Sequence, residues 1–166
     1  MKEYLVPPLC GRAYLYGSKA DASVSSRIVT ALTMHISPEI LAQALAEGTV
    51  RFPQFSVGVA VENEEYVFCP ADAPVPVFEA SATLPKTFDD PALAGYLFMV
   101  SYSHKTVYFD FHRAIADEFG MMSFVKAVLL RYLELSGYPV RTDGSVKLLS
   151  GEYFKAEGED PMPHMD

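Results

Sequence analysis

The sequence predicts an α+β fold, a mixed α/β two-layer sandwich in which two main helices cover a mixed sheet of about five strands. Three observations lead to it: several short runs alternate apolar and polar residues, two longer stretches are apolar at helical spacing, and their order is strand, helix, strands, helix. Half of the 166 residues are apolar, enough for one core. We expect a single domain over residues 1–145 and an acidic tail over 146–166.

The first strand and the first helix follow each other directly. Residues 25–36, SSRIVTALTMHI, are β-branched and partly alternating, which is typical of a strand. Ser37 is a favoured N-cap residue and Pro38 suits the first helical position. Apolar residues then recur at helical spacing, and we expect Gly48 to end this helix.

The middle of the chain predicts shorter strands. Residues 56–70, SVGVAVENEEYVFCP, alternate on both sides of an acidic turn and indicate a hairpin. The proline-rich residues 70–81 predict an edge strand, because proline cannot donate a ladder hydrogen bond. Residues 82–95 are expected to form a loop.

The clearest pattern lies in the second half. Residues 96–113, YLFMVSYSHKTVYFDFHR, alternate aromatic residues and predict a hairpin with its turn near His104. A helix is predicted from Phe119 to Ser136, ended by Gly137 and Pro139. Its apolar stripe should be buried. The stripe consists of Met121, Phe124, Val125, Val128, Leu129, Tyr132 and Leu133.

Charge and cysteine content exclude several classes of function. A net charge of −8 argues against nucleic acid or an anionic membrane surface as partner, and no apolar run approaches the roughly 20 residues of a membrane span. The N-terminus lacks a signal-peptide pattern. Cys10 and Cys69 have no CxxC or histidine partner nearby, so we expect no metal site and a reduced, cytoplasmic setting.

The stretch FDFHRAIADEFGMMSF, residues 109–124, sets a His, an Arg and an Asp between a predicted strand and a predicted helix. Together with the element order, the SPEILAQAL helix, the RFPQF turn and the YLFMVSY hairpin, it resembles the N-terminal half of the chloramphenicol acetyltransferase-like, CoA-dependent acyltransferase superfamily. The condensation-domain and alcohol acetyltransferase branches are the most similar. The resemblance covers roughly residues 24 to 138.

That family has the signature HHxxxDG, whose second His is the general base and whose Asp holds the loop. With Gly120 and Phe124 in register, the first His falls on His112, the second on Arg113, and the Asp on Asp117, while Glu118 replaces the Gly. An arginine stays protonated and offers only donors, so Arg113 cannot act as the base.

In one alternative alignment, a one-residue insertion between the catalytic His and the Asp places the catalytic His on His112, which would then be the general base. Strand alternation argues against it, because Phe109 and Phe111 share a face with Arg113 and His112 points to the other side. The structural alternative is that His112 is a hydrogen-bonded histidine of the sheet and that Arg113 and Asp117 form an ion pair that fixes the loop.

The resemblance implies a two-half protein with a tunnel between the halves and a DFGWG-type motif in the second half, but this chain has no Trp. We favour a non-catalytic module that binds a partner chain or a small acyl ligand, without a tightly bound cofactor. The alternative is a CoA-dependent O- or N-acyltransferase with acyl-CoA as co-substrate, His112 as base and a second subunit completing the site. Either a homodimer or a separately encoded second half is expected to cover the open sheet edge.

Overall fold

A computed structural model describes residues 5–17, 25–81, 84–85, 87–141, 146 and 149. Within these ranges the order of the main elements begins with α1 (Leu9–Gly17), β1 (Ser25–Ala31) and α2 (Pro38–Arg51) and ends with β5 (Phe98–Ser103), β6 (Thr106–His112) and α3 (Glu118–Leu135). Between α2 and β5 lie β2 (Val57–Glu62), β3 (Glu65–Pro70) and β4 (Val77–Glu79). The predicted tail over 146–166 lies outside the described residues except for Val146 and Leu149.

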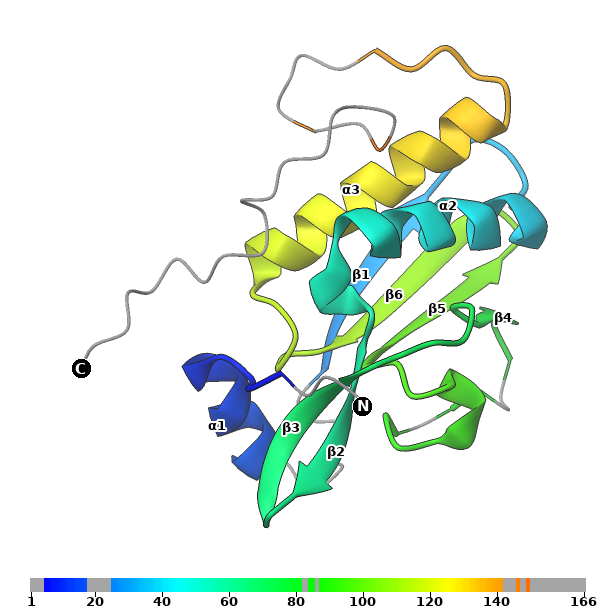
Figure 1. The fold of residues 1–166 in the computed structure, drawn as a ribbon. Coiled ribbons are helices and arrows are strands. Elements are labelled where there is room, and N and C mark those ends of the chain that lie inside the picture. The colour runs from blue at the N-terminus through cyan, green and yellow to red at the C-terminus, as the bar shows by residue number, and fades with distance from the viewer. Residues whose placement is uncertain are drawn as a thin grey trace.

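The main sheet has four strands in the order β1-β6-β5-β4 (Figure 1). β6 pairs antiparallel with both β1 and β5, and β4 pairs parallel with β5, so the sheet is mixed. The predicted hairpin is β5–β6, and the predicted proline-flanked edge strand is β4. β1 ends at Ala31, earlier than the pattern predicted, and forms the other edge.

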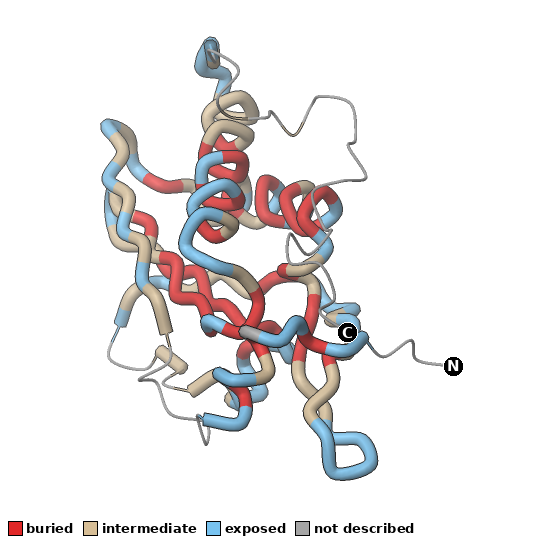
Figure 2. The backbone as a smooth tube through the Cα atoms, turned by 90° about the vertical axis from the view of Figure 1, so that its left-hand side faces the viewer, coloured by how far each residue is buried: buried red, intermediate tan, exposed pale blue. Residues whose placement is uncertain are grey.

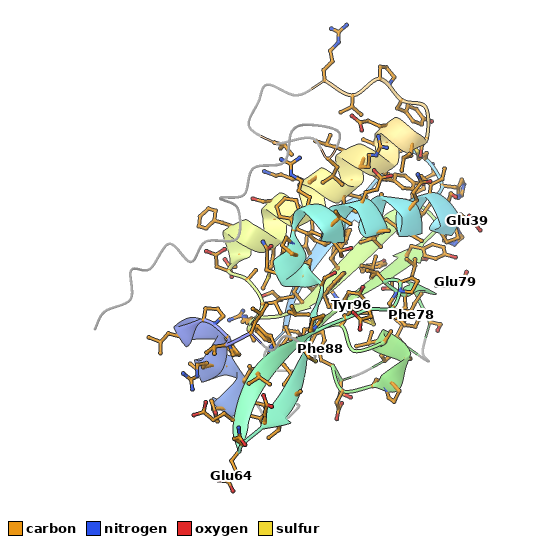
Figure 3. All side chains as sticks on the ribbon, viewed as in Figure 1. Glu39, Glu64, Phe78, Glu79, Phe88 and Tyr96 are labelled. Carbon is orange, nitrogen blue, oxygen red and sulfur yellow. The ribbon has the colours of Figure 1, made fainter. Side chains whose placement is uncertain are left out.

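The predicted hairpin over 56–70 forms, but it does not join the main sheet. β2 and β3 pair antiparallel as a separate two-stranded sheet that projects from the molecule. Figure 3 shows Glu64 at its tip, on the side of the molecule away from α2 and α3. The α+β class is confirmed, but the expected single sheet of about five strands is divided into sheets of four and two.

Helices α2 and α3 lie side by side on one face of the main sheet (Figure 1). The prediction that Gly48 ends α2 is wrong, because the helix continues to Arg51. A Cβ built on Gly48 would lie 2.7 Å from Cγ2 of Val128 and 3.3 Å from a ring carbon of Phe124. This glycine therefore allows the two helices to approach closely, which outweighs its low helix propensity.

The core lies between α3 and the sheet, where Figure 2 shows the buried segments. The prediction for α3 is confirmed for Phe124, Val128 and Tyr132, which are at most 1% exposed, whereas Leu133 is only partly buried. Phe124 stacks on Phe55 with ring centroids 4.2 Å apart. The Tyr132 hydroxyl accepts a hydrogen bond of 2.9 Å from the Ser37 amide and so ties α3 to the start of α2. Phe124 also contacts Phe98 and Phe111 of the sheet, and buried aromatic pairs of this kind stabilise the packing of α3 on the sheet.

Helix α1 was not predicted, and it begins directly after Pro7 and Pro8. Both prolines precede the helix, where they are compatible with its first turn. A Cβ on Gly11 would lie 2.5 Å from the carbonyl oxygen of Ala114, so α1 packs directly against the loop after β6. That loop contains Arg113 and leads to Asp117, two of the predicted site residues.

Candidate functional site

His112, the last residue of β6, is buried at 6% exposure. Its Nδ1 accepts a hydrogen bond of 3.1 Å from the backbone amide of Ala114. Its ring meets Phe88 edge to face, with centroids 5.4 Å apart. Burial lowers the pKa of the His112 imidazole below its ordinary value, so the neutral form is favoured.

His112 and Phe111 face opposite sides of the sheet, as strand alternation requires. Phe111 contacts Phe124 on the side of the helices. We call the opposite side the outer face, where Arg27 of β1 and Met99 of β5 are both in register with Asp110. Phe88 lies beside these residues, and its ring contact places His112 on the outer face.

Arg113, the next residue, is exposed and lies outside the strand. Its Nε donates a hydrogen bond of 3.1 Å to Oγ of Ser26 on β1. Asp117 caps α3, and its Oδ1 accepts a hydrogen bond of 2.7 Å from the amide of Gly120. The predicted ion pair between Arg113 and Asp117 is therefore wrong: among the described residues each binds a different partner.

Beside Arg113 is a hollow of about 370 Å³ between β1 and the first turns of α3, which we call the helix-side hollow. Ile28 of β1 and Met122 of α3 supply apolar surface, and Arg113 supplies a cation. Met121 also lines it but is only 1% exposed, which confirms its predicted packing role. Arg27 and Glu118 also line it, so the hollow combines two cations and one carboxylate with an adaptable apolar wall.

On the outer face, Arg27 and Asp110 form a two-point ion pair that was not predicted. Nε of Arg27 donates to Oδ1 of Asp110 at 2.6 Å, and a second guanidinium nitrogen donates to Oδ2 at 3.1 Å. The hydrogen bond to Asp110 raises the pKa of Arg27 above its already high ordinary value. The two residues are 83 positions apart. Only the β1–β6 register could have indicated that they pair.

Two other kinds of feature are absent from the described ranges. No group of three His, Cys, Asp or Glu side chains there lies close enough to share a metal ion. No helix there has the length and apolar character needed to cross a membrane.

Comparison with solved structures identifies the fold. No protein-family model matches the sequence, and no curated protein matches it. The starter condensation domain of the rhizomide synthetase RzmA superimposes with a TM-score of 0.58 at 15% identity, covering 86% of this chain and 40% of that one. The condensation domain of the monacolin K polyketide synthase MokA gives 0.56 at 16% identity, covering 84% and 36%.

A third similar structure, SgcC5 from Streptomyces globisporus, gives a TM-score of 0.56 at 15% identity, covering 72% of this chain and 32% of that chain. A variant of the RzmA starter domain was solved in complex with C8-CoA. This chain spans 40% or less of the length of each of these proteins. Its fold is therefore that of a part of these condensation domains, and it fits an N-terminal half of the CoA-acyltransferase-like fold.

Proposed function

We propose that this chain is a non-catalytic half-domain of the acyltransferase fold that binds a small acyl ligand in the helix-side hollow. The observation that supports it most directly is the residue at the base position. Arg113 borders the hollow where the family's motif has its catalytic His. A guanidinium cannot accept a proton from an attacking hydroxyl or amine.

The hydrogen bonding of His112 argues against it as a replacement base. A backbone amide can only donate, so the Ala114 contact requires a lone pair on Nδ1. In a neutral imidazole with the lone pair on Nδ1, the proton is on Nε2, which is then a donor. His112 would have to break its contact with Ala114 before Nδ1 could accept a proton from a substrate.

The lining of the helix-side hollow favours an acyl ligand. Ile28 and Met122 can contact an alkyl chain, and thioether side chains adapt to irregular apolar shapes. Arg113 can donate to a carbonyl or carboxylate oxygen with N–H groups other than the Nε–H bound to Ser26. A complex of a fold relative with C8-CoA supports octanoyl-CoA as the first ligand to test.

A partner is part of the proposal. The similar condensation domains are more than twice as long as this chain, and we propose that a second copy or a separately encoded half binds here and contributes surface to the site. We favour a homodimer, because two-fold pairs are the commonest soluble oligomers.

Calorimetric titration with octanoyl-CoA tests the binding site. Met122 is 40% exposed, so Met122→Glu should leave the fold intact while placing a carboxylate in the hollow. We expect affinity to fall at least about tenfold in Met122→Glu and to persist in Met122→Leu. Equal binding by wild type and Met122→Glu would refute this site, and no binding by wild type would refute the acyl ligand.

A further inference from the structure

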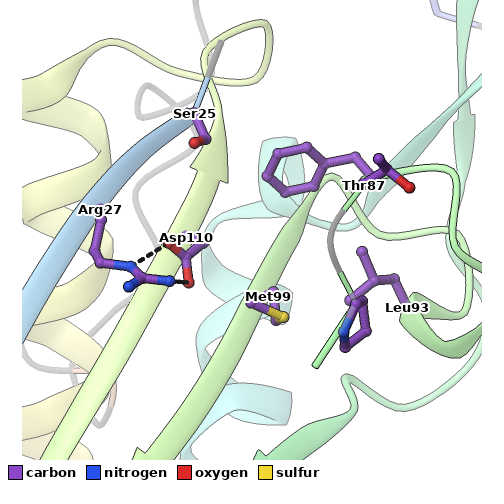
Figure 4. A pocket seen from close by; sticks show the side chains of 8 residues that line it. Ser25, Arg27, Thr87, Leu93, Met99 and Asp110 are labelled. Atoms are coloured by element: carbon purple, nitrogen blue, oxygen red, sulfur yellow. Dashed lines mark hydrogen bonds and ion pairs between the residues drawn. The ribbon is translucent and has the colours of Figure 1, made fainter. Parts of the chain in front are cut away.

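The outer face has a second hollow, of about 350 Å³, on the side of the sheet away from α2 and α3 (Figure 4). Arg27 and Asp110 form its floor, and Met99 lies beside them on β5. Residues of the segment before β5, including Phe88 and Leu93, form the facing wall. We call it the outer hollow. It adjoins the helix-side hollow at the edge strand β1, where Ser25 and Arg27 line both.

The floor of the outer hollow is charged but formally neutral. Asp110 is 7% exposed, and both of its carboxylate oxygens accept hydrogen bonds from Arg27. The guanidinium lies 5.8 Å from the ring centroid of Tyr108, which helps to orient it. Only the carboxylate of this pair is buried, while the guanidinium reaches the surface of the hollow.

Arg27 retains donors for a ligand. A guanidinium has five N–H groups, and the pair with Asp110 uses two of them. The remaining three have no hydrogen-bond acceptor among the described residues. The Arg27 side chain is 56% exposed, so these donors are accessible. A carbonyl oxygen in the hollow can accept from one of them.

The wall is mainly apolar. Leu93 and Met99 are 1% and 7% exposed, so the rest of the protein holds their side chains in place. Phe88 packs edge-on against His112, which limits the movement of its ring. Fixed apolar walls around a few polar groups are typical of small-molecule sites, and the volume is at the lower end of their range.

These features define the ligand class. The apolar walls favour a ligand that is mostly apolar, and the remaining N–H groups of Arg27 favour a ligand with an oxygen that accepts a hydrogen bond. Asp110 beside Arg27 offsets the attraction for an anion and leaves no unpaired negative charge for a cation. We propose that the outer hollow binds an uncharged, mostly apolar small molecule whose carbonyl oxygen accepts a hydrogen bond from Arg27.

Three probes of similar shape test this class: neutral benzamide, anionic benzoate and cationic benzamidine. Their binding to the full chain at millimolar concentrations is followed by NMR, with the backbone amides of Leu93 and Met99 as local reporters. We expect benzamide to bind more tightly than either ion and to shift both amides. The proposal would be overturned if benzamide did not bind. It would also be overturned if benzoate or benzamidine bound as tightly as benzamide.

Two variants locate the site. Thr87 lines the hollow on a partly exposed loop, and Thr87→Trp should fill the space and weaken benzamide binding at least about tenfold. Thr33→Trp, on an exposed loop after β1, is the matched control and should bind normally. Arg27→Lys keeps a cation beside Asp110 but removes the planar guanidinium with its several N–H donors. It should weaken benzamide binding about two- to tenfold. Unchanged affinity in either Thr87→Trp or Arg27→Lys would contradict the assignment.

Discussion

The backbone amide of Ala114 donates a hydrogen bond to Nδ1 of His112, so the buried imidazole at the end of β6 is a hydrogen-bond acceptor. This one contact has two consequences. The loop after β6 is fixed two residues beyond the strand, and the neutral imidazole has its remaining proton on Nε2.

The same contact predicts a pH dependence of stability. Burial lowers the pKa of His112 in the folded state, so between that value and about 6.5 the unfolded state binds more protons. The stability that neutral His112 contributes is complete above about pH 6.5 and is lost as the pH falls through the folded pKa. Urea unfolding from pH 7.5 to 5 should show this decline. In His112→Asn, which keeps an acceptor at the Nδ1 position, the decline should be smaller, and an identical pH profile would contradict the assignment.

Asp117 should act through helix capping. Its carboxylate accepts a hydrogen bond from the Gly120 amide at the start of α3. Asp117→Ala should lower the free energy of unfolding by about 0.5–2 kcal/mol, and Asp117→Asn should restore most of it. Chemical denaturation measures both. If Asp117→Ala and Asp117→Asn lower the free energy of unfolding by the same amount, helix capping does not explain the Asp at this position.

Gly48 should be required for the approach of α2 to α3. Gly48→Ala gains helix propensity but places a methyl group 2.7 Å from Val128, and we expect a net loss of roughly 1–3 kcal/mol. Val128→Ala creates space, so the double variant should lose less than the sum of the single losses. Additive losses in the double-mutant cycle would mean that these two residues do not clash.

Self-association should use the edge of β1 that pairs with no strand among the described residues. The Leu32 amide donates to the Lys105 carbonyl, so by alternation the N–H of Val29 points away from β6. Val29 is also 55% exposed. Val29→Pro should therefore spare the β1–β6 hydrogen bonds yet prevent another strand from pairing at this edge. Sedimentation should show a dimer for wild type and for Val29→Thr, and a monomer for Val29→Pro; a wild-type monomer at all concentrations would exclude the homodimer.

Local pattern was sufficient for some elements. The burial of Phe124 and Tyr132 on α3 and the β5–β6 hairpin can be predicted from apolar spacing, which is a property of neighbouring residues. The motif alignment on His112, Arg113 and Asp117 also needed only local residues.

Tertiary contacts determined what the sequence did not predict. Gly48 lies inside α2 rather than at its end, because the absence of a side chain there makes room for Val128 of α3. The Arg27–Asp110 pair depends on strand register, which joins residues far apart in the chain. The hairpin over 56–70 was predicted, but no local signal says that it stays apart from the main sheet and forms a bridge with Leu5.

The most direct test of the proposed function is thiol release from acetyl-CoA and octanoyl-CoA, with hydroxyl and amine acceptors present. It compares wild type with His112→Ala and Arg113→Ala. Loss of a general base typically removes a factor of roughly 100 to 10,000 in rate, so we predict no release above background in any of the three proteins. Turnover by wild type that disappears in His112→Ala but survives in Arg113→Ala would contradict the account and identify His112 as a catalytic base.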